Sequence, residues 1–540
     1  KKGRAGGRGA GDADTGRADG AGAGGEGRAV ARDSAAASAA TTRAFPAGSY
    51  VVRMDQPYSR AADALLDYQY WSPNDPQKNP YDDTGWTFPE AFGAQAVRVV
   101  DPSVLNAPMA LVTGDVRAPG GVTGNGSVFA INHNGDNALA TLRYRFPAAD
   151  FQAAEDAFTA AGQKFVRGSF IVRGVAQGDL DRAAQELGVR VYALAAAPSV
   201  AMHPARAARV AILHTWAGTQ TEGWWRQAFD QLQIPFTYIS TQEVSRDANL
   251  NSSYDVILFP PAGSSGQAII DGMSMWRNPM PWKNSPETPN IGTWAQTDDV
   301  RPGLGYSGVQ NLQSFVAKGG VLVAVNNTAD FAINFGMTNG VSINQPAGGK
   351  VVGSLLRTRI VDHASPIVYG VPDSLAVYSE DGESFSVSNT RGGRGGGGGG
   401  GSSRATGRGT PDDADVVQGM PALDARFAAP ARPTAQPWQA TPLMEDQMRN
   451  PLNIIPPAQR PRVALRFSST SSLLVSGLLD GGGEIAQRPV VVDVPVQRGH
   501  IVLFANNPIW RGETIGSYFL VFNTILNFDN LGVGRKLDPR

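Results

Sequence analysis

The sequence predicts an α/β fold built on a doubly wound parallel sheet, preceded by a smaller α+β domain. Three observations lead to this prediction. The chain has 540 residues, which allows more than one domain. In its second half, short uninterrupted apolar runs alternate with segments of helical periodicity, a pattern typical of parallel strands covered on both faces. Two Gly-rich stretches interrupt the periodic pattern and mark where ordered structure is expected to stop.

The larger predicted domain covers residues 206–535. Its apolar runs and helical segments alternate as in a flavodoxin-like domain, with insertions at 263–306, which is rich in Pro and Trp, and at 391–437, a Gly-rich loop expected to be disordered. Strands are expected at Val210–Thr215, Phe236–Ser240, Asp255–Phe259, Val321–Val325, Val463–Phe467, Val490–Pro495 and His500–Ala505, and helices at Thr219–Leu232, Gly308–Lys318 and Gly516–Asn527.

The smaller predicted α+β domain covers residues 44–205, and residues 1–43 form a low-complexity tail that is expected to be disordered. In the smaller domain, strands are expected at Ser49–Met54, Ser127–Asn132, Ala140–Phe146, Phe170–Val175 and Val189–Leu194, and helices at Ser59–Tyr68, Asp150–Ala161 and Asp179–Leu187.

Composition excludes several classes of function. The chain has no Cys, which excludes disulfides, Cys-ligated metal sites and a thiol nucleophile. Its net charge of -1 argues against a nucleic-acid partner, since phosphate neutralisation needs a basic excess. No apolar run is long enough to cross a membrane, and no signal peptide is visible. Because the chain begins at Lys1, we expect it to be the later portion of a longer polypeptide.

The carboxyl ends of the predicted parallel strands carry unusual polar and aromatic residues. In open parallel sheets, ligands bind at this edge. We therefore predict a rim that binds a small ligand or a peptide end, with Arg511 able to hold a carboxylate. The alternative is that the Asn residues of the rim only satisfy loop backbone. The rim residues that follow strands are His214, Trp216, Asn326, Asn327, Asn506, Trp510 and Arg511.

The start of the first helix of this domain has two interpretations. Glu222 and Trp224 lie close in sequence to His214, so that Glu222 could serve as an acid or base and both could contribute to the rim. The pattern from Thr219 to Glu222 also fits a capping box, which we favour.

Neither a nucleophile nor a metal site is apparent. The turn after Val321–Val325 contains Thr328 but no Cys, and no Gly-x-Ser-x-Gly elbow is present. The five His residues lack zinc-ligand spacing, and the nearest pattern, from His133 to Asp136, is more typical of a surface or loop His.

Two segments carry a family resemblance. Residues 47–58 (AGSYVVRMDQPY) and 80–87 (PYDDTGWT) resemble the region downstream of the catalytic domain in large bacterial zinc carboxypeptidase-type metallopeptidases. Residues 136–143 and 167–171 provide further matches. Residues 222–224 (EGW) and 510–512 (WRG) resemble the cysteine-free class I glutamine amidotransferase-like domain that follows in such proteins.

The resemblance implies a non-catalytic, accessory and substrate-binding role. Enzymes of that family use zinc held by His-x-x-Glu and a later His, and this chain contains no His-x-x-Glu. No catalytic or metal residue is therefore carried over. The resemblance implies that zinc belongs to a catalytic domain upstream, that this domain supplies the peptide or protein substrate, and that the protein is exported. Two rival hypotheses are a carbohydrate- or peptide-binding module, suggested by loop Trp residues, and a hydrolase that uses the rim.

Overall fold

The computed structural model describes residues 44–73, 80–346, 349–390 and 451–537. The chain divides into two compact units, 1–53 and 54–540. Residues 44–53 form no helix or strand, so the predicted strand Ser49–Met54 is wrong. The predicted disordered loop 391–437 and the tail 1–43 lie outside the described residues.

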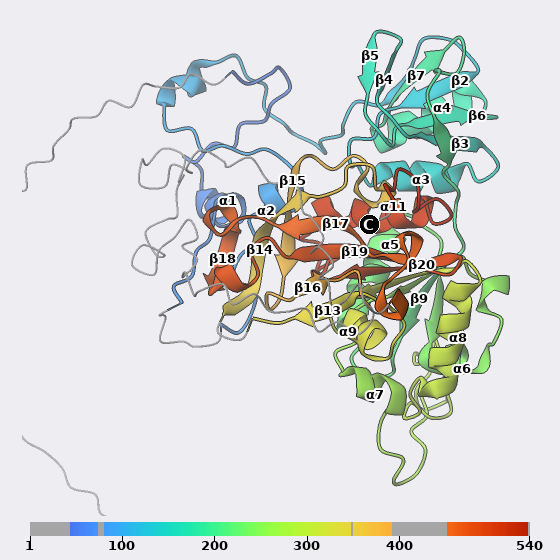
Figure 1. Cartoon of the computed structure of the whole chain (residues 1–540). Helices are drawn as coiled ribbons and strands as arrows, with labels where there is room; N and C mark the ends of the chain where they lie inside the picture. Colours follow the sequence, from blue (N-terminus) through green and yellow to red (C-terminus); the bar gives the residue numbers. More distant parts are fainter. Residues whose placement is uncertain (1–43, 74–79, 347–348, 391–450, 538–540) are drawn as a thin grey trace, which may run out of the picture. The chain divides into compact units, whose positions relative to one another are not determined.

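A large sheet forms the centre of the second unit (Figure 1). Its strands follow the order β10-β9-β11-β12-β20-β19-β17-β14-β15, and β18 also pairs with β14. Their bounds are β9 Val210–His214, β10 Thr237–Ser240, β11 Val256–Phe259, β12 Val321–Val325, β14 Lys350–Ile360, β15 Ser374–Ser379, β17 Arg462–Phe467, β18 Leu474–Asp480, β19 Pro489–Val496 and β20 Gly499–Phe504.

Five neighbouring strands, β10, β9, β11, β12 and β20, pair in parallel. Taken in chain order, they give the sequence 2-1-3-4-5 of a flavodoxin-like doubly wound sheet. Every residue of β9, β11 and β12 is buried, as expected for strands covered on both faces. The predicted fold class is thus confirmed for this half of the sheet.

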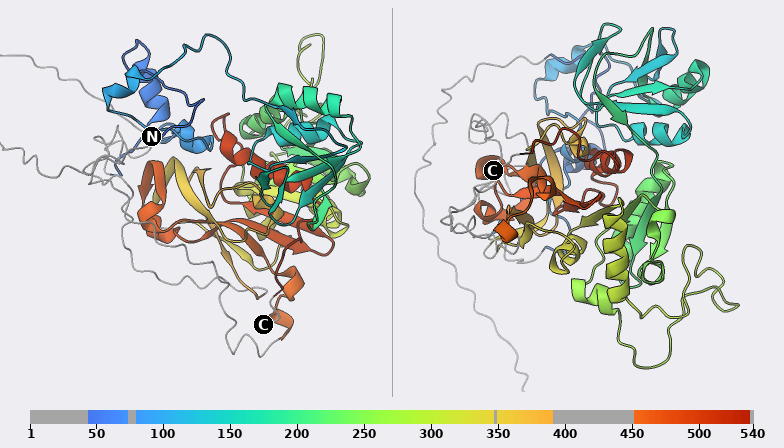
Figure 2. Two further views of the ribbon diagram at one scale, coloured as in Figure 1. Left: turned by 90° about the horizontal axis from the view of Figure 1, so that it is seen from above. Right: turned by 45° about the vertical axis from the view of Figure 1, so that its right-hand side comes forward.

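The rest of the sheet is antiparallel, which the sequence did not predict. β19 pairs antiparallel with β20, β17 with β19, and β14 with β15, β17 and β18. The strands expected at Val463–Phe467 and Val490–Pro495 exist but do not belong to the parallel part. A buried apolar run predicts a strand and carries no information about its direction. Figure 2 shows the yellow and orange-red strands of this part.

Helices cover both faces of the parallel part. α5 and α11 meet through Phe229 and Phe522, whose ring centroids are 5.4 Å apart, whereas α6 packs on α8 and α7 packs on α9. Within the range 263–306, where the sequence predicts an insertion, α7 forms near the start and residues 272–304 form no helix or strand. The bounds are α5 Gln220–Gln231, α6 Thr241–Arg246, α7 Gly266–Asp271, α8 Gly305–Ala317, α9 Asn327–Asn334 and α11 Tyr518–Leu526.

A smaller sheet has the order β1-β7-β2-β6-β3-β8 and packs with helices α3 and α4. Its elements are β1 Gly121–Thr123, β2 Val128–Ile131, α3 Ala138–Arg145, β3 Asp150–Ala154, β6 Phe170–Arg173, α4 Gln177–Leu187, β7 Arg190–Leu194 and β8 Met202–Pro204, with a separate hairpin of β4 Phe158–Ala160 and β5 Gln163–Phe165.

Two predictions for this sheet are reversed. The strand expected at Ala140–Phe146 is part of helix α3, which begins where Asp136 Oδ1 accepts a hydrogen bond from the backbone N–H of Ala138 at 2.9 Å. The helix expected at Asp150–Ala161 is instead strands β3 and β4, because pairing of β3 with β6 and β8 outweighs local helix propensity.

The remaining elements are short. They are helices α1 Ser59–Leu66 and α2 Phe88–Ala91, an antiparallel pair of strands β13 Val341–Asn344 and β16 Ser384–Val387, and the 3-10 turns Pro102–Asn106, Leu250–Ser252, Pro366–Val368, Pro451–Asn453, Pro457–Gln459, Thr470–Ser472, Gly482–Glu484 and Ile515–Ser517.

An N-terminal strap, residues 69–71 and 80–87, binds along β18. The backbone N–H of Trp71 donates to Gly477 O at 3.1 Å, and that of Gly477 donates to Gln69 O at 2.7 Å. Thr84 Oγ1 accepts from the N–H of Leu478 at 2.9 Å. A Cβ on Gly85 would overlap the backbone of Ser476, so only glycine fits. The segment 80–87, singled out by its resemblance, therefore has a structural role.

We predict that Gly85→Ala lowers the free energy of unfolding by about 2 kcal/mol or more, because the new methyl group meets backbone that cannot rotate away. The control is Gly178→Ala in α4, where an added Cβ has nothing within 4 Å and should stabilise the helix by up to about 1 kcal/mol. Denaturant unfolding measures both variants. Equal stability of the two variants would contradict the close packing of the strap.

Candidate functional site

The turn between β12 and α9 has the geometry of a nucleophile elbow. Asn326 occupies it with φ 48° and ψ −122°, a conformation that residues other than Gly rarely adopt. Its N–H donates to Phe504 O at 2.8 Å. Thr328 Oγ1 holds the turn, since it accepts from the N–H of Val325 at 2.8 Å and lies 2.6 Å from Phe259 O, to which it donates. A strained strand–turn–helix presents a reactive side chain in hydrolases, and here it presents an amide.

Three buried amides, one at the elbow and two shortly after β20, have unpaired atoms. Asn326 Nδ2 donates to Ala505 O at 3.2 Å, which connects the elbow to the end of β20. Among the described residues, no partner is found for Asn326 Oδ1, for either polar atom of Asn506 or for Asn507 Oδ1. Asn506 is fully buried, and unpaired buried polar atoms are rare in folded proteins. These amides need a water molecule or a ligand as partner.

Asn327 behaves differently from its neighbour. Its Oδ1 accepts from the N–H of Ala262 at 3.1 Å and its Nδ2 donates to Ser264 O, so that it fastens the loop after β11. This is the loop-satisfying role that the sequence left open for the Asn residues of the rim.

A second group of side chains lies at the ends of β9 and β10. The His214 ring stacks on Tyr238 with centroids 4.0 Å apart and meets Trp216 edge-on at 4.9 Å. The Tyr238 hydroxyl donates to Glu222 Oε1 at 2.5 Å. The Arg226 guanidinium lies over the Tyr238 ring, 4.4 Å from its centroid. His214 and Glu222 thus meet through Tyr238, a residue that the sequence did not single out.

Burial controls the protonation of this group. Desolvation lowers the pKa of His214 to about 4, so that the imidazole is neutral at physiological pH. Desolvation also raises the pKa of Glu222 to about 7, although the hydrogen bond from Tyr238 and the charge of Arg226 act in the opposite direction.

The favoured capping box at Thr219 is wrong. The Thr219 side chain makes no capping hydrogen bond, and the Glu222 carboxylate accepts from the Tyr238 hydroxyl. A capping box does form at the next helix, where Ser240 and Glu243 exchange hydrogen bonds at the start of α6.

The tryptophans near α5 have different surroundings. Trp224 is half-buried beside Trp225, which is fully buried. Trp294, from the insertion, packs over Arg226, whose guanidinium carbon lies 4.3 Å from the ring centroid. Trp276 and Trp282, also in the insertion, are largely exposed.

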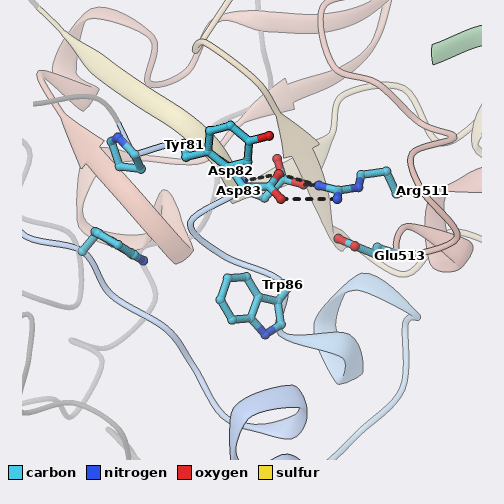
Figure 3. Close-up of a pocket in the computed structure, with 8 residues that line it drawn as sticks. Tyr81, Asp82, Asp83, Trp86, Arg511 and Glu513 are labelled. Carbon is cyan, nitrogen blue, oxygen red and sulfur yellow. Dashed lines mark hydrogen bonds and ion pairs between the residues drawn. The ribbon is translucent and has the colours of Figure 1, made fainter. Parts of the chain in front are cut away.

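Arg511 lines a third place, a pocket of about 410 Å³ shown in Figure 3, and Trp510 adjoins this pocket through Asp83. The Trp510 indole stacks on Tyr378 with centroids 5.0 Å apart and donates to Asp83 Oδ2 at 2.9 Å. Arg511 forms ion pairs with Asp82 at 2.5 Å and with Asp83 at 2.9 Å. The carboxylate that we expected Arg511 to hold is therefore supplied by the chain itself.

The histidines also differ from expectation. His133 lies in the loop after β2, as one part of the prediction has it, but it is buried and its Nε2 lies 2.8 Å from Asn523 Oδ1, so the predicted surface position is wrong. Among the residues placed by the structure, no group of three or more His, Asp or Glu could hold a metal ion. No helix in the described ranges is long and apolar enough to span a membrane.

Comparisons with known proteins give structural likeness only. No family model matches the sequence, and no curated protein matches it. Similar solved structures include a putative ThuA-like protein from Bacteroides uniformis (12% identity, 62% of this chain and 98% of that chain, TM-score 0.28), PurLQS from Thermotoga maritima (11%, 59% and 99%, 0.29) and a glutamine amidotransferase, also from Thermotoga maritima (12%, 34% and 64%, 0.21). The larger α/β region of this chain has the 2-1-3-4-5 strand order of a flavodoxin-like sheet, with a strained turn at Asn326.

The pH dependence of stability tests the environment of Glu222. The folded state binds the Glu222 proton more tightly than the unfolded chain, because the pKa rises from 4.5 to about 7. Relative to Glu222→Gln, wild type should therefore lose about 3 kcal/mol of unfolding free energy between pH 4.5 and 7 and no more above that range.

Denaturant unfolding at each pH measures this difference. In Tyr238→Phe, the carboxyl group loses the hydrogen bond that favours its ionised form, so the decline should extend to higher pH. Parallel pH curves for wild type and Glu222→Gln would contradict the buried environment of this carboxyl group.

Proposed function

We propose that this chain is a non-catalytic module that binds a peptide group at its elbow. One observation carries the proposal: the amide of Asn506, fully buried and unpaired, lies next to the strand end that holds Asn326. The position is the carboxyl edge of a doubly wound sheet, where ligands of such sheets bind.

The chemistry of the unpaired atoms indicates the ligand class. A carboxamide offers one acceptor and a pair of donors, so that it can accept from the N–H and donate to the C=O of a peptide unit. Asn326 and Asn507 also have unpaired acceptor oxygens. All of these groups are neutral, which favours a neutral amide ligand over a charged one, since a buried charge needs a compensating partner.

The same turn lacks the means for covalent chemistry. Asn326 stands where an elbow presents its nucleophile, and the chain contains no Cys. The Thr328 hydroxyl is engaged with Phe259 O and the N–H of Val325 and is fully buried. The rival hydrolase, which would use Thr328 with His214, Glu222 and Arg511, gains no support from this arrangement.

We further propose, from the sequence resemblance, that the module is the accessory part of a zinc carboxypeptidase-like protein, where it would hold the peptide substrate. The reading frame that encodes this chain, followed upstream, should then contain His-x-x-Glu. An uninterrupted upstream frame that lacks the motif would contradict this assignment. So would release of C-terminal residues from peptides by the isolated chain supplied with zinc.

The variant Asn506→Leu tests the peptide site. Because the amide has no partner in the described part of the fold, an apolar side chain of similar size should leave the free energy of unfolding unchanged or raise it by about 1 kcal/mol. Binding of the probe acetyl-trialanine amide, measured by calorimetry, should weaken at least about tenfold, since two hydrogen bonds are lost.

The matched control is Asn334→Leu, which removes an exposed amide at the end of α9 and should alter neither binding nor stability appreciably. Binding of maltotriose in place of the peptide would favour the carbohydrate-binding alternative. A loss of more than about 2 kcal/mol in Asn506→Leu would show that the amide has a structural role and would contradict the proposal.

A further inference from the structure

We propose that the pocket beside Arg511 binds an organic ammonium ion. The pocket is separate from the elbow and is formed by the strap on one side and the loop after β20 on the other. It has a volume of about 410 Å³, which suits a small ligand. Its lining residues are Trp71, Pro80, Tyr81, Asp82, Asp83, Trp86, Arg511 and Glu513.

The charges of the pocket favour a cation. Three carboxylates line it against one guanidinium. Both oxygens of Asp82 accept from Arg511, at 2.5 and 3.3 Å, and Asp83 accepts from Arg511, Trp510 and the Tyr378 hydroxyl. These groups satisfy one another. An anionic ligand would have to displace Asp82 or Asp83 from Arg511, whereas a cation leaves both pairs intact.

Glu513 is the third lining carboxylate and takes no part in these ion pairs. It is half-buried, and Figure 3 shows its carboxylate pointing from the side of Arg511 toward the space between the two aspartates and Trp86. A cation in this space would lie beside Glu513 in a partly desolvated setting, where an ion pair is stronger than at an open surface.

Aromatic side chains supply the second element of cation recognition. Tyr81 is fully exposed at the mouth, and Trp71 and Trp86 are half-buried in the wall. The Trp86 indole N–H is engaged with Ala64 O at 2.8 Å, which fixes the ring in place. Aromatic rings placed around a carboxylate bind quaternary and alkyl ammonium groups, because the faces of the rings have a negative potential.

The protonation of Glu513 should make binding depend on pH. Burial, with the nearby charges of Asp83 and Asp82, raises the pKa of Glu513 to about 7, while Arg511 acts to lower it. Tyr378 and Tyr518 also face this carboxyl group, and neither ionises near neutrality. A cation favours the ionised carboxylate, so affinity should rise as the pH rises from about 6 to about 8.

Calorimetric titration of the intact chain tests the proposal. Choline is the cationic probe, 3,3-dimethyl-1-butanol is its neutral isostere, and acetyl-lysine amide presents a side-chain ammonium. We expect saturable binding of choline or of the lysine compound and none of the neutral isostere. Glu513→Gln should weaken the binding about tenfold and abolish its pH dependence, and Tyr81→Ala, at an exposed position, should weaken it severalfold.

Glu287→Gln, which removes an exposed carboxylate of the insertion, is the matched control and should bind like wild type. Equal binding of choline and its neutral isostere would overturn the proposal. The absence of binding by both cations, or full affinity in a folded Glu513→Gln variant, would overturn it too. None of these outcomes bears on the elbow, because Asn506 does not line this pocket.

Discussion

The position of β20 in the large sheet is the constraint on which the rest of the fold depends. β20 pairs in parallel with β12 on one side and antiparallel with β19 on the other, so that one strand unites the two halves of the sheet. Asp493, fully buried on β19, is paired with His500 of β20 at 2.7 Å across this junction. The end of β20 then supplies the carbonyl groups of Phe504 and Ala505 that hold Asn326 in its strained turn. The elbow exists because a distant part of the chain closes the parallel sheet beside it.

Much of the parallel half could be predicted from the sequence, because buried parallel strands appear as continuous apolar runs and their helices keep a regular period. The errors have a common physical origin. Helix α3 and strand β3 were exchanged because local apolar spacing is ambiguous over short segments, and the neighbours that decide between helix and strand are distant in sequence. The antiparallel half was missed for a similar reason, since strand direction depends on connections rather than on composition.

The sequence predicts one rim at the carboxyl ends of the parallel strands, and in the structure the rim residues fall into three places: around Tyr238, around Asn326 and around Asp83. Tyr238 could have been found, because a 2-1-3-4-5 order places its strand next to that of His214. The pairing of Arg511 with Asp82 and Asp83 could not, since it joins residues more than 400 positions apart in the chain.

The strap along β18 bears on how the protein can be shortened for experimental work. Gln69 and Trp71 provide the backbone partners of Gly477, and Thr84 and Gly85 cover the adjoining backbone of the same strand. A recombinant form that begins at the helix following Thr87 would leave these strand groups open, and an open strand edge is a template for self-association. A chain shortened in this way would thus aggregate, although every residue of the large sheet is present.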